Sequence, residues 1–355
     1  PKRVTPEQFL AFHVTQVGAG IGDQELMLRY VGMNSEMLEK LESWGVSIPR
    51  EADGSFHFDL PWGRKQVEQS GEPSGDEPSG GAQSDLEIVV EKPAETDLHA
   101  CELDESVLRG SWEATVEKLD KQINAVAVRV RAVDGTLLYD SRVEDAIDCG
   151  AATGSSVARG AIKGLTESDY YTIACFSALH DNYYSFAHMV DAAVQQINYS
   201  GYIWYATDST FYLAPEKQAT RAYLAALASE AAEMGFDELL LDEFTYPTKG
   251  RLSNIKTDER TMTQSAALCL LADEMKAAIG ERKLSVRVDE ETFLAGSNEV
   301  SGVNVAELAK HVDRIYVETT ADQLPTLREL AEKYGCELIP ILADAAPDGS
   351  YFIAN

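Results

Sequence analysis

From residue 98 onward, short apolar runs alternate with longer segments in which apolar residues recur every three or four positions. The short runs predict buried strands, and the longer amphipathic segments predict helices. The expected strands are Leu98–Leu103, Ala125–Arg131, Tyr171–Ser177, Glu238–Asp242, Leu284–Asp289, Arg314–Glu318, Glu337–Leu342 and Tyr351–Ala354. The expected helices are Trp112–Lys121, Ser155–Lys163, His188–Gln196, Gln218–Met234, Thr263–Ile279, Val305–His311 and Leu324–Lys333. Because strands and helices alternate over a length close to the ~250 residues of a (β/α)8 TIM barrel, we predict an α/β barrel over residues 98–355.

Glycines mark where several of these helices end. Gly235, Gly280 and Gly335 each follow a predicted helix directly. Glycine enters the left-handed conformation of a helix C-terminus without steric cost, so this spacing supports the helix boundaries. One more segment, Gly201–Thr207, reads as a strand, and we expect it in an inserted hairpin.

The sequence changes character before the barrel. Residues 64–97 are rich in Gly, Ser, Pro and acidic residues, which predicts a flexible, disordered linker. Residues 1–63 are expected to form a small, mostly helical segment. Gly18 and Gly20 begin a dinucleotide-binding pattern, but Asp23 occupies the position of its last glycine, so nucleotide binding is not indicated.

Charge and composition exclude several classes of function. The chain holds 30 basic and 59 acidic side chains, a formal net charge of −29. Phosphate binding needs clustered Lys and Arg, so we expect no nucleic acid and favour a neutral or cationic partner. The sequence contains no run of about 18 apolar residues, so we expect no membrane span in this chain. Five scattered cysteines form no CxxC pair and the histidines lack metal-ligand spacing, so we expect neither a metal nor another cofactor.

Acidic residues stand at the ends of three predicted strands. Asp242 and Glu243 follow one buried run, and Asp289 and Glu318 end two later strands. The carboxyl ends of barrel strands form the active face, so these acids are candidates for chemistry. We take Asp242, Asp289 and Glu318 as candidate catalytic residues and Glu243 as a ligand contact; the alternative is that they only cap turns.

Arg287 adds a positive charge near these acids. It lies two residues before Asp289 and therefore on the same face of the strand. A guanidinium there could bind substrate, or it could neutralise Asp242 or Asp289 inside the barrel. The second possibility is a structural network of arginine and aspartate that fills the barrel with paired charge.

Aromatic residues supply a further candidate binding surface. Trp204, Tyr205 and Tyr212 crowd the expected insert, and Tyr246 follows the strand that ends at Asp242. Sugars stack their apolar faces on aromatic rings, and Asp208 beside them could bind a hydroxyl group. The alternative is that these rings pack the insert against the barrel.

Two blocks of the sequence resemble a family of glycoside-hydrolase-like barrels common on bacterial envelope proteins. GFDELLLDEFTYP, Gly235–Pro247, is similar to that family's G-F-D-E-I-x-F-D-Y-x-R-F-P signature, and VRAVDGTLLYDS, Val130–Ser141, is similar to a second block with a G-x-x-x-Y-D-S turn. The resemblance spans nearly all of residues 98–355. It implies a TIM barrel carried outside the cytoplasm or at the cell envelope, with Asp242 as the strand-end aspartate.

The chain departs from that family at several polar positions. Thr245 replaces the signature arginine, and Arg129 and Arg131 stand where the second strand usually carries acids and a lysine. Ser177–Leu179 replace a Lys-Asp-Pro, and Ala214 replaces an Asn or Asp before a proline. Because a glycosidase normally needs two carboxyl groups, these losses put catalysis itself in question.

Two interpretations of the function therefore stay open. The first is a glycoside hydrolase-like domain acting on a bacterial or host glycan, and the second is a non-catalytic carbohydrate-binding or cell-envelope scaffold protein. A third, weaker option rests on Gly20–Val46, which resembles a short piece of the fumarate reductase and L-aspartate oxidase flavoproteins but lacks the flavin fingerprint. The sequence does not decide between enzyme and binding protein, nor does it give an oligomeric state.

Overall fold

The computed structural model describes residues 97–110, 112–197, 202–257, 260–346 and 348–354. The expected helical segment at residues 1–63, its flavoprotein-like stretch and all of the expected linker except Asp97 lie outside these residues.

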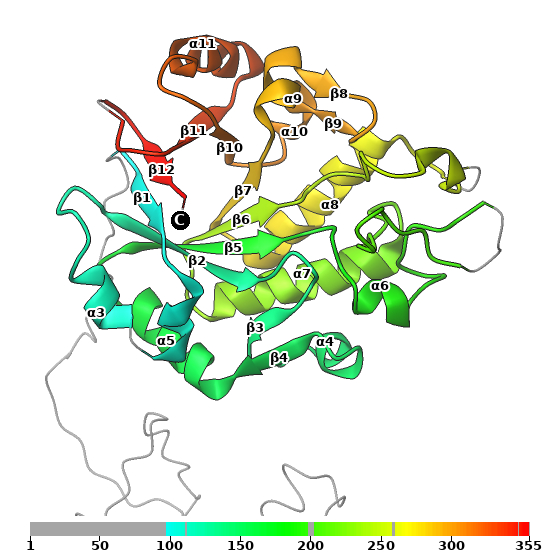
Figure 1. The fold of residues 1–355 in the computed structure, drawn as a ribbon, viewed down its shortest axis with the longest axis horizontal. Helices are drawn as coiled ribbons and strands as arrows, with labels where there is room; N and C mark the ends of the chain where they lie inside the picture. The colour runs from blue at the N-terminus through cyan, green and yellow to red at the C-terminus, as the bar shows by residue number, and fades with distance from the viewer. Residues whose placement is uncertain (1–96, 111, 198–201, 258–259, 347, 355) are drawn as a thin grey trace, which may run out of the picture. The chain divides into compact units, whose positions relative to one another are not determined.

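Eight parallel strands form a closed barrel (Figure 1). The strands are β1 (His99–Glu102), β2 (Ala125–Arg131), β5 (Tyr171–Ser177), β6 (Glu238–Asp242), β7 (Lys283–Arg287), β10 (Arg314–Glu318), β11 (Glu337–Leu342) and β12 (Tyr351–Ile353). Each strand pairs with the next in this order, and β1 closes the ring because it pairs with both β2 and β12. The TIM barrel expected from the alternation of apolar segments is confirmed.

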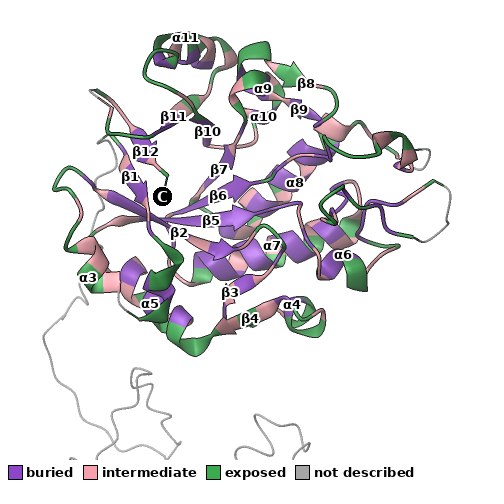
Figure 2. Cartoon of the chain, viewed as in Figure 1, coloured by how far each residue is buried: buried purple, intermediate pink, exposed green. Residues whose placement is uncertain are grey.

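Helices cover the outside of the barrel. The helices are α3 (Trp112–Val116), α4 (Glu144–Asp148), α5 (Ser156–Thr166), α6 (Tyr184–Ala187), α7 (Gln218–Glu233), α8 (Gln264–Ile279), α9 (Glu290–Ala295), α10 (Val305–Leu308) and α11 (Leu324–Tyr334), with 3-10 turns η2 (Glu105–Arg109) and η3 (Leu252–Asn254). The short strands are β3 (Leu137–Tyr139), β4 (Ala152–Ser155), β8 (Ser297–Asn298) and β9 (Val303–Asn304). Of these, β3 and β4 extend the sheet outward from β2, and β8 and β9 form a separate two-stranded sheet. Figure 1 shows α7 and α8 side by side along β5 and β6, and Figure 2 shows these strands buried.

The prediction of a helix at His188–Gln196 is wrong. The nearest helix is the single turn α6, and Ala193, Gln195 and Gln196 form isolated bridges with Leu213, Ile203 and Ile255. The carbonyl oxygens of residues 190, 192 and 193 accept hydrogen bonds from Lys217 and Thr220 side chains. Distant donors therefore replace the helical hydrogen bonds that the local sequence pattern favours. Gly201–Thr207 forms bridges at Ile203 and Tyr205 rather than a continuous strand within its described residues.

Side-chain alternation divides the barrel strands between two cores. On β6, Leu240 packs inside the barrel, whereas Leu239 and Leu241 pack outward against the helices. The residues two positions from Leu240, Glu238 and Asp242, therefore face the interior at opposite ends of the strand. The same alternation gives the barrel an apolar middle and a charged layer at each end.

A bulge in β2 turns two nearby arginines to opposite sides. Arg129 pairs in register with Cys175, but Arg131 pairs with the very next residue, Phe176, so one extra residue is inserted between them. Arg129 therefore points into the barrel beside Cys175. Arg131 points outward, where its guanidinium lies over the Phe176 ring.

Candidate active site

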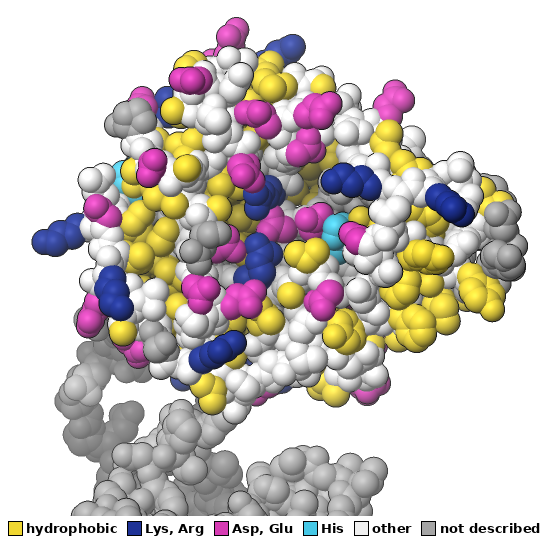
Figure 3. Space-filling view, viewed as in Figure 1, with side chains coloured by type: hydrophobic (Ala, Val, Ile, Leu, Met, Phe, Trp, Pro, Cys, Tyr) yellow, Lys and Arg dark blue, Asp and Glu magenta, His cyan; other side chains and the backbone are white. Residues whose placement is uncertain are grey.

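Five charged side chains gather at the carboxyl ends of the barrel strands. They are Glu102 on β1, Arg129 on β2, Asp242 on β6, Arg287 on β7 and Glu318 on β10, and we call them the mouth cluster. Each contacts at least one other member, so they form one connected network. Figure 3 shows acidic and basic side chains together with a histidine near the centre of the visible face.

Asp242 is at the centre of the mouth cluster. Its Oδ2 accepts a hydrogen bond from Arg129 Nη2 at 2.9 Å, and its Oδ1 lies 3.7 Å from Arg287 Nη1. The Asp242 side chain is only 10% exposed. Both carboxylate oxygens therefore face a guanidinium group, and of the alternatives left open for Arg287 the structure shows contact with Asp242.

Two more carboxylates share these guanidinium groups. Arg129 Nη2 lies 3.1 Å from Glu102 Oε1, and Arg287 donates a hydrogen bond to Glu318. Three carboxylates thus face two cations, and one negative charge is left unmatched within the cluster. Glu318, with 68% of its side chain exposed, is the member most open to solvent.

Two buried donors beside Asp242 have no protein partner among the described residues. They are Nη1 of Arg129 and Oγ of Ser177, which pairs in register with Asp242. Buried polar atoms are normally hydrogen bonded, and these two have almost no solvent-accessible surface, so two hydrogen-bonding groups beside Asp242 are left unsatisfied.

Glu243 has a backbone conformation that is unusual for its residue type. Its φ is +50°, in the left-handed region that favours glycine. The chain turns sharply at this point, and the Glu243 side chain, 41% exposed, reaches His180 on the loop after β5. Its Oε2 lies 3.2 Å from His180 Nε2.

His180 is largely enclosed. Burial lowers its pKa, against the opposing effects of the Glu243 and Asp208 carboxylates, so the ring is neutral at pH 7. The Tyr212 ring packs edge-on against it, with ring centroids 4.4 Å apart. Nδ1 is buried and has no hydrogen-bond partner among the described residues.

Two of the acidic residues singled out in the sequence cap local structure. Asp289 is the N-cap of α9, where its Oδ1 accepts a hydrogen bond from Thr292 N at 2.8 Å. Asp208 accepts a hydrogen bond from Thr210 N, which lowers the pKa of its carboxyl group. The structure therefore brings Asp242, Arg287 and Glu318 together, but it gives Asp289 and Asp208 separate partners.

The candidate aromatic residues differ in how far they can reach a ligand. Trp204 is buried and donates a hydrogen bond from Nε1 to the Arg251 carbonyl. Tyr246 is buried, and its hydroxyl donates to Glu216 at 2.5 Å. Tyr212 is buried against His180, whereas Tyr205 is 56% exposed. Trp204 packs in the cluster of the insert and Tyr246 in the main core, whereas Tyr205 is open to solvent.

The Tyr-Asp-Ser part of the second resembling block lies away from the mouth cluster. Tyr139 and Ser141 donate hydrogen bonds to the buried Glu230 of α7, and Asp140 pairs with Arg159, which also contacts Glu230. This block therefore anchors the β3 edge to the helix layer.

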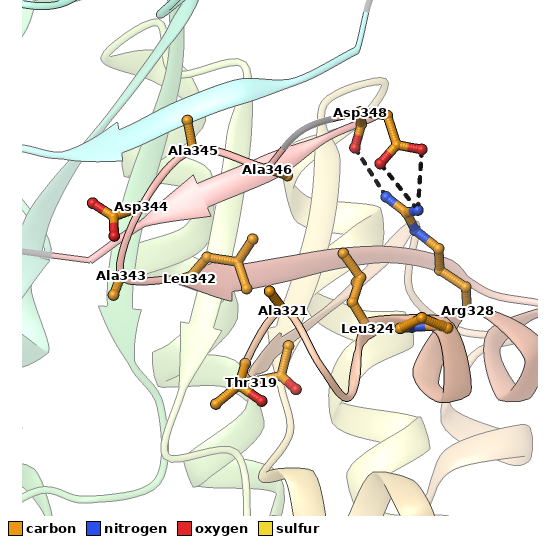
Figure 4. Close-up of a pocket in the computed structure, with 12 residues that line it drawn as sticks. Thr319, Ala321, Leu324, Arg328, Leu342, Ala343, Asp344, Ala345, Ala346 and Asp348 are labelled. Atoms are coloured by element: carbon orange, nitrogen blue, oxygen red, sulfur yellow. Dashed lines mark hydrogen bonds and ion pairs between the residues drawn. The ribbon is translucent and has the colours of Figure 1, made fainter.

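A cavity of about 370 Å³ adjoins the rim of the mouth (Figure 4). It is lined by the loops after β10 and β11 and by the start of α11, including Thr319, Leu324 and Leu342. Arg328 closes one side through hydrogen bonds to Asp348. Thr319 directly follows Glu318, so the cavity begins one residue beyond the mouth cluster.

Two functional candidates in the structure are missing from those expected from the sequence. Glu102 is the last residue but one of the predicted strand Leu98–Leu103 and ends β1 in the structure, so the strand-end rule could have found it. His180 stands in the sequence only as a histidine without metal-ligand spacing. Its approach to Glu243 depends on the path of the loop after β5, for which the local sequence carries no signal.

In the described part of the chain, no group of three or more His, Cys, Asp and Glu side chains is arranged to hold a metal ion. The helices described there include none with the length and apolarity needed to cross a membrane.

Comparison with solved structures gives distant similarities. A hypothetical protein from Ruminiclostridium thermocellum ATCC 27405 is 20% identical with a TM-score of 0.44, covering 52% of this chain and 96% of that chain. The glycoside hydrolase domain of PelA from Pseudomonas aeruginosa is 14% identical with a TM-score of 0.41, covering 69% of this chain and 83% of that chain. A GH20 exo β-N-acetylglucosaminidase from Vibrio harveyi is 9% identical with a TM-score of 0.45, covering 70% of this chain and 41% of that chain.

No curated protein matches the sequence. A family match is found instead, and it covers residues 110–317, more than half of the chain and most of the barrel. The family is described as "Putative glycosyl hydrolase domain", and the chain belongs to it.

Proposed function

We propose that the barrel is a glycoside hydrolase domain that binds a glycan at the mouth cluster and uses Asp242 as the ionised carboxylate of the reaction. One observation carries this proposal: Asp242 stands at the carboxyl end of β6 between two guanidinium groups. The family match supports the class of reaction. A location outside the cytoplasm or at the cell envelope belongs to the proposal and rests on the sequence resemblance alone.

The position of Asp242 fits one of the two carboxyl roles in glycoside hydrolysis. One carboxyl group donates a proton to the leaving oxygen, while the other acts on the opposite side as a nucleophile or a base. A carboxylate held by two cations is suited to the charged role, because its partners stabilise the negative form. The unpartnered Ser177 hydroxyl and Arg129 Nη1 next to it are buried, and they would gain sugar hydroxyl groups as partners only if glycan binding opened access to them.

A non-catalytic carbohydrate-binding role is the second candidate. It is favoured by the same arginines, which engage both oxygens of Asp242 and leave its side chain mostly buried. A network of this kind can have a purely structural role, because pairing the charges lowers the free-energy cost of burying them. In that case a glycan would be bound without being cleaved, through exposed groups such as Tyr205 and Glu318.

The test compares Asp242→Asn with Asp289→Asn on a panel of 4-nitrophenyl glycosides and oligosaccharides. Asp242→Asn is expected to lower kcat by about a hundredfold or more while glycan binding, measured by calorimetry, is retained. Asp289→Asn is the matched control, since asparagine caps a helix as well as aspartate does, and its activity should stay near that of the native chain.

Each outcome has a meaning. Binding without turnover in the native chain supports the carbohydrate-binding role. A native chain that neither binds nor cleaves any glycan would overturn both candidates. Equal losses in the two variants would contradict the assignment of Asp242.

A further inference from the structure

We propose that Glu243 is the proton donor of this site and that His180 is its positioning residue. The inference rests on the proposed function, since it names the second carboxyl group of the same reaction. It is drawn from three observations: the backbone at Glu243, its contact with an enclosed histidine, and the different charge surroundings of the adjacent Asp242.

The backbone at Glu243 is held in a conformation that costs energy for any residue with a Cβ. Its φ of +50° is maintained by hydrogen bonds from the loop after β5, with Ala178 N donating to the Asp242 carbonyl and Leu179 N donating to the Glu243 carbonyl. In a continued strand the Glu243 side chain would point outward, away from the interior that Asp242 faces. The left-handed turn instead sends it to His180 at the rim. Such local strain is typical of functional positions, where it fixes a side chain for a task.

The loop that carries His180 is itself fixed by a buried ion pair. Arg131 pairs with Asp181, and both side chains are fully buried. The same guanidinium donates to the carbonyl oxygens of Ser177, Ala178 and His180. His180 therefore has little freedom to move away from Glu243.

His180 can interact with Glu243 in either protonation state of the carboxyl group. A neutral imidazole donates from Nε2–H to a carboxylate, and its other tautomer accepts from a protonated carboxyl group at the same nitrogen. The charged and titratable groups around the ring are Glu243, Asp208 and Arg131, with the Tyr212 ring packed edge-on. The 3.2 Å approach of Nε2 to Oε2 is within hydrogen-bond reach. This arrangement suits a carboxyl group that gains and loses a proton in each cycle.

Glu243 and Asp242 then divide the reaction between them. Protonated Glu243 gives its proton to the glycosidic oxygen as the bond to the anomeric carbon breaks, and the bonding electrons leave with that oxygen. The Asp242 carboxylate balances the positive charge that develops on the sugar. A water molecule supplies the new hydroxyl group at the anomeric carbon, and its proton restores Glu243. The products are two hydroxyl compounds from one glycoside and one water.

The test uses the leaving group to separate proton donation from every other effect. A 4-nitrophenolate leaves without a proton, whereas methoxide does not. Glu243→Gln should therefore lose about a hundredfold or more in kcat on methyl glycosides and less than about tenfold on the matching 4-nitrophenyl glycosides. Asp242→Asn should lose activity on both.

A second variant separates catalysis from folding. Glu243→Gly removes the carboxyl group and also the strain at φ +50°, because glycine adopts this conformation freely. We expect its melting temperature to equal or exceed that of the native chain, with the same selective loss on methyl glycosides. A more stable variant with that loss cannot owe the loss to unfolding.

His180 is tested by the pH profile. Replacing it with alanine should lower kcat on methyl glycosides with little change in KM and shift the alkaline limb of the kcat profile, which reports the proton on the donor. His180→Gln, which places an amide nitrogen near the position of Nε2, should restore part of the activity. A purely structural histidine would lower activity without moving that limb.

Turnover by the Asp242 and Glu243 variants distinguishes failure of the Glu243 assignment from failure of the proposed function. If Asp242→Asn is inactive but Glu243→Gln loses equally on both classes of glycoside, or loses nothing, the assignment of Glu243 is overturned and the site stands. If neither variant affects turnover, the proposed function fails with it. Glycan binding without turnover by the native chain overturns the proton-donor role.

Discussion

Gly135 shows how one residue without a side chain supports the site from a distance. Its φ is +93°, and a Cβ at this position would lie 2.7 Å from Oδ2 of Asp181. Asp181 is the buried partner of Arg131, which holds the carbonyl groups of the loop that carries His180. The turn between β2 and β3 can approach this ion pair only because residue 135 is glycine.

We predict that Gly135→Ala destabilises the fold and disturbs the His180 loop. Gly150→Ala is the matched control, since Gly150 also has a positive φ, +80°, but nothing lies within 4 Å of its Cβ position. Both variants should lose about 1 kcal/mol from the strained φ, and Gly135→Ala should lose a further ~1–3 kcal/mol from the overlap. Urea unfolding measures both, and similar losses in the two variants would contradict the role of the contact.

Burial of His180 predicts a pH dependence of stability. Its pKa is lowered from the ordinary value of 6.5 in the folded protein, mainly by desolvation. Between the lowered pKa and 6.5 the unfolded chain binds more protons, so the free energy of unfolding rises with pH there and the stabilisation is lost as the pH falls. His180→Gln should flatten this part of the curve, measured by urea unfolding from about pH 5 to pH 7.5. An unchanged slope in the variant would show that the ring does not contribute.

Sequence could locate acidic residues at strand ends but could not assign their roles. Asp242 and Asp289 both follow a buried strand, yet Asp242 contacts two arginines and Asp289 caps a helix. The difference arises because β6 ends with residue 242 still in the barrel, facing inward, whereas β7 ends at Arg287, two residues before Asp289. Which side chain meets Asp242 across the barrel depends on the closure of the ring, and no local pattern reports that.

At the level of elements, strands were far easier to predict than the insert. Five barrel strands have the bounds expected from the sequence, since buried parallel strands give continuous apolar runs between helices. The insert after β5 contains one apolar run, Gly201–Thr207, but its described residues form only isolated bridges. Its backbone pairs across distant positions such as His180 with Tyr212, and these long-range bridges outweigh the helical periodicity of residues 188–196.

Helix α7 is fixed to the β3 edge by one buried acid, and this leads to a prediction at the scale of elements. Glu230 accepts hydrogen bonds from Tyr139, Ser141 and the Arg142 backbone at 3.0, 2.6 and 2.7 Å, and it pairs with Arg159. Glu230→Gln should lower the free energy of unfolding by about 2–4 kcal/mol, because an amide cannot accept all these donors or neutralise the guanidinium.

The exposed Glu233 on the same helix provides the control for Glu230. Glu233→Gln should change stability by less than about 0.5 kcal/mol. Thermal and urea unfolding of the two variants would settle the comparison. A loss at position 233 as large as that at position 230 would mean that helix propensity, rather than the anchor, is responsible.

On the scale of the whole molecule, the two ends of the barrel interior have different roles. The mouth cluster at the carboxyl ends has one unpartnered donor, Arg129 Nη1, and one exposed acid, Glu318, whereas the charged layer at the amino ends is closed. There both carboxylate oxygens of Glu238 are hydrogen bonded. Its Oε1 accepts from the hydroxyl groups of Ser285 at 2.6 Å and Tyr316 at 2.8 Å. Its Oε2 accepts from the Tyr171 hydroxyl at 3.0 Å and from Arg314 at 2.6 Å. Barrels commonly place stability at this end and chemistry at the other.

Glu238 should therefore stabilise the closed ring without affecting the site. Its side chain joins β6 to β5, β7 and β10. Replacing Glu238 with glutamine leaves Arg314 without its buried counter-charge, and the NH2 group of the new amide then faces a group that also donates a hydrogen bond. We expect Glu238→Gln to cost about 3–5 kcal/mol, with KM and kcat of the remaining folded protein unchanged. Glu337→Gln removes the other carboxylate on Arg314, which is 46% exposed, and should cost less than about 1 kcal/mol. Similar losses for the two variants, or a change in KM with Glu238→Gln, would contradict this division of the barrel into a stabilising end and a reacting end.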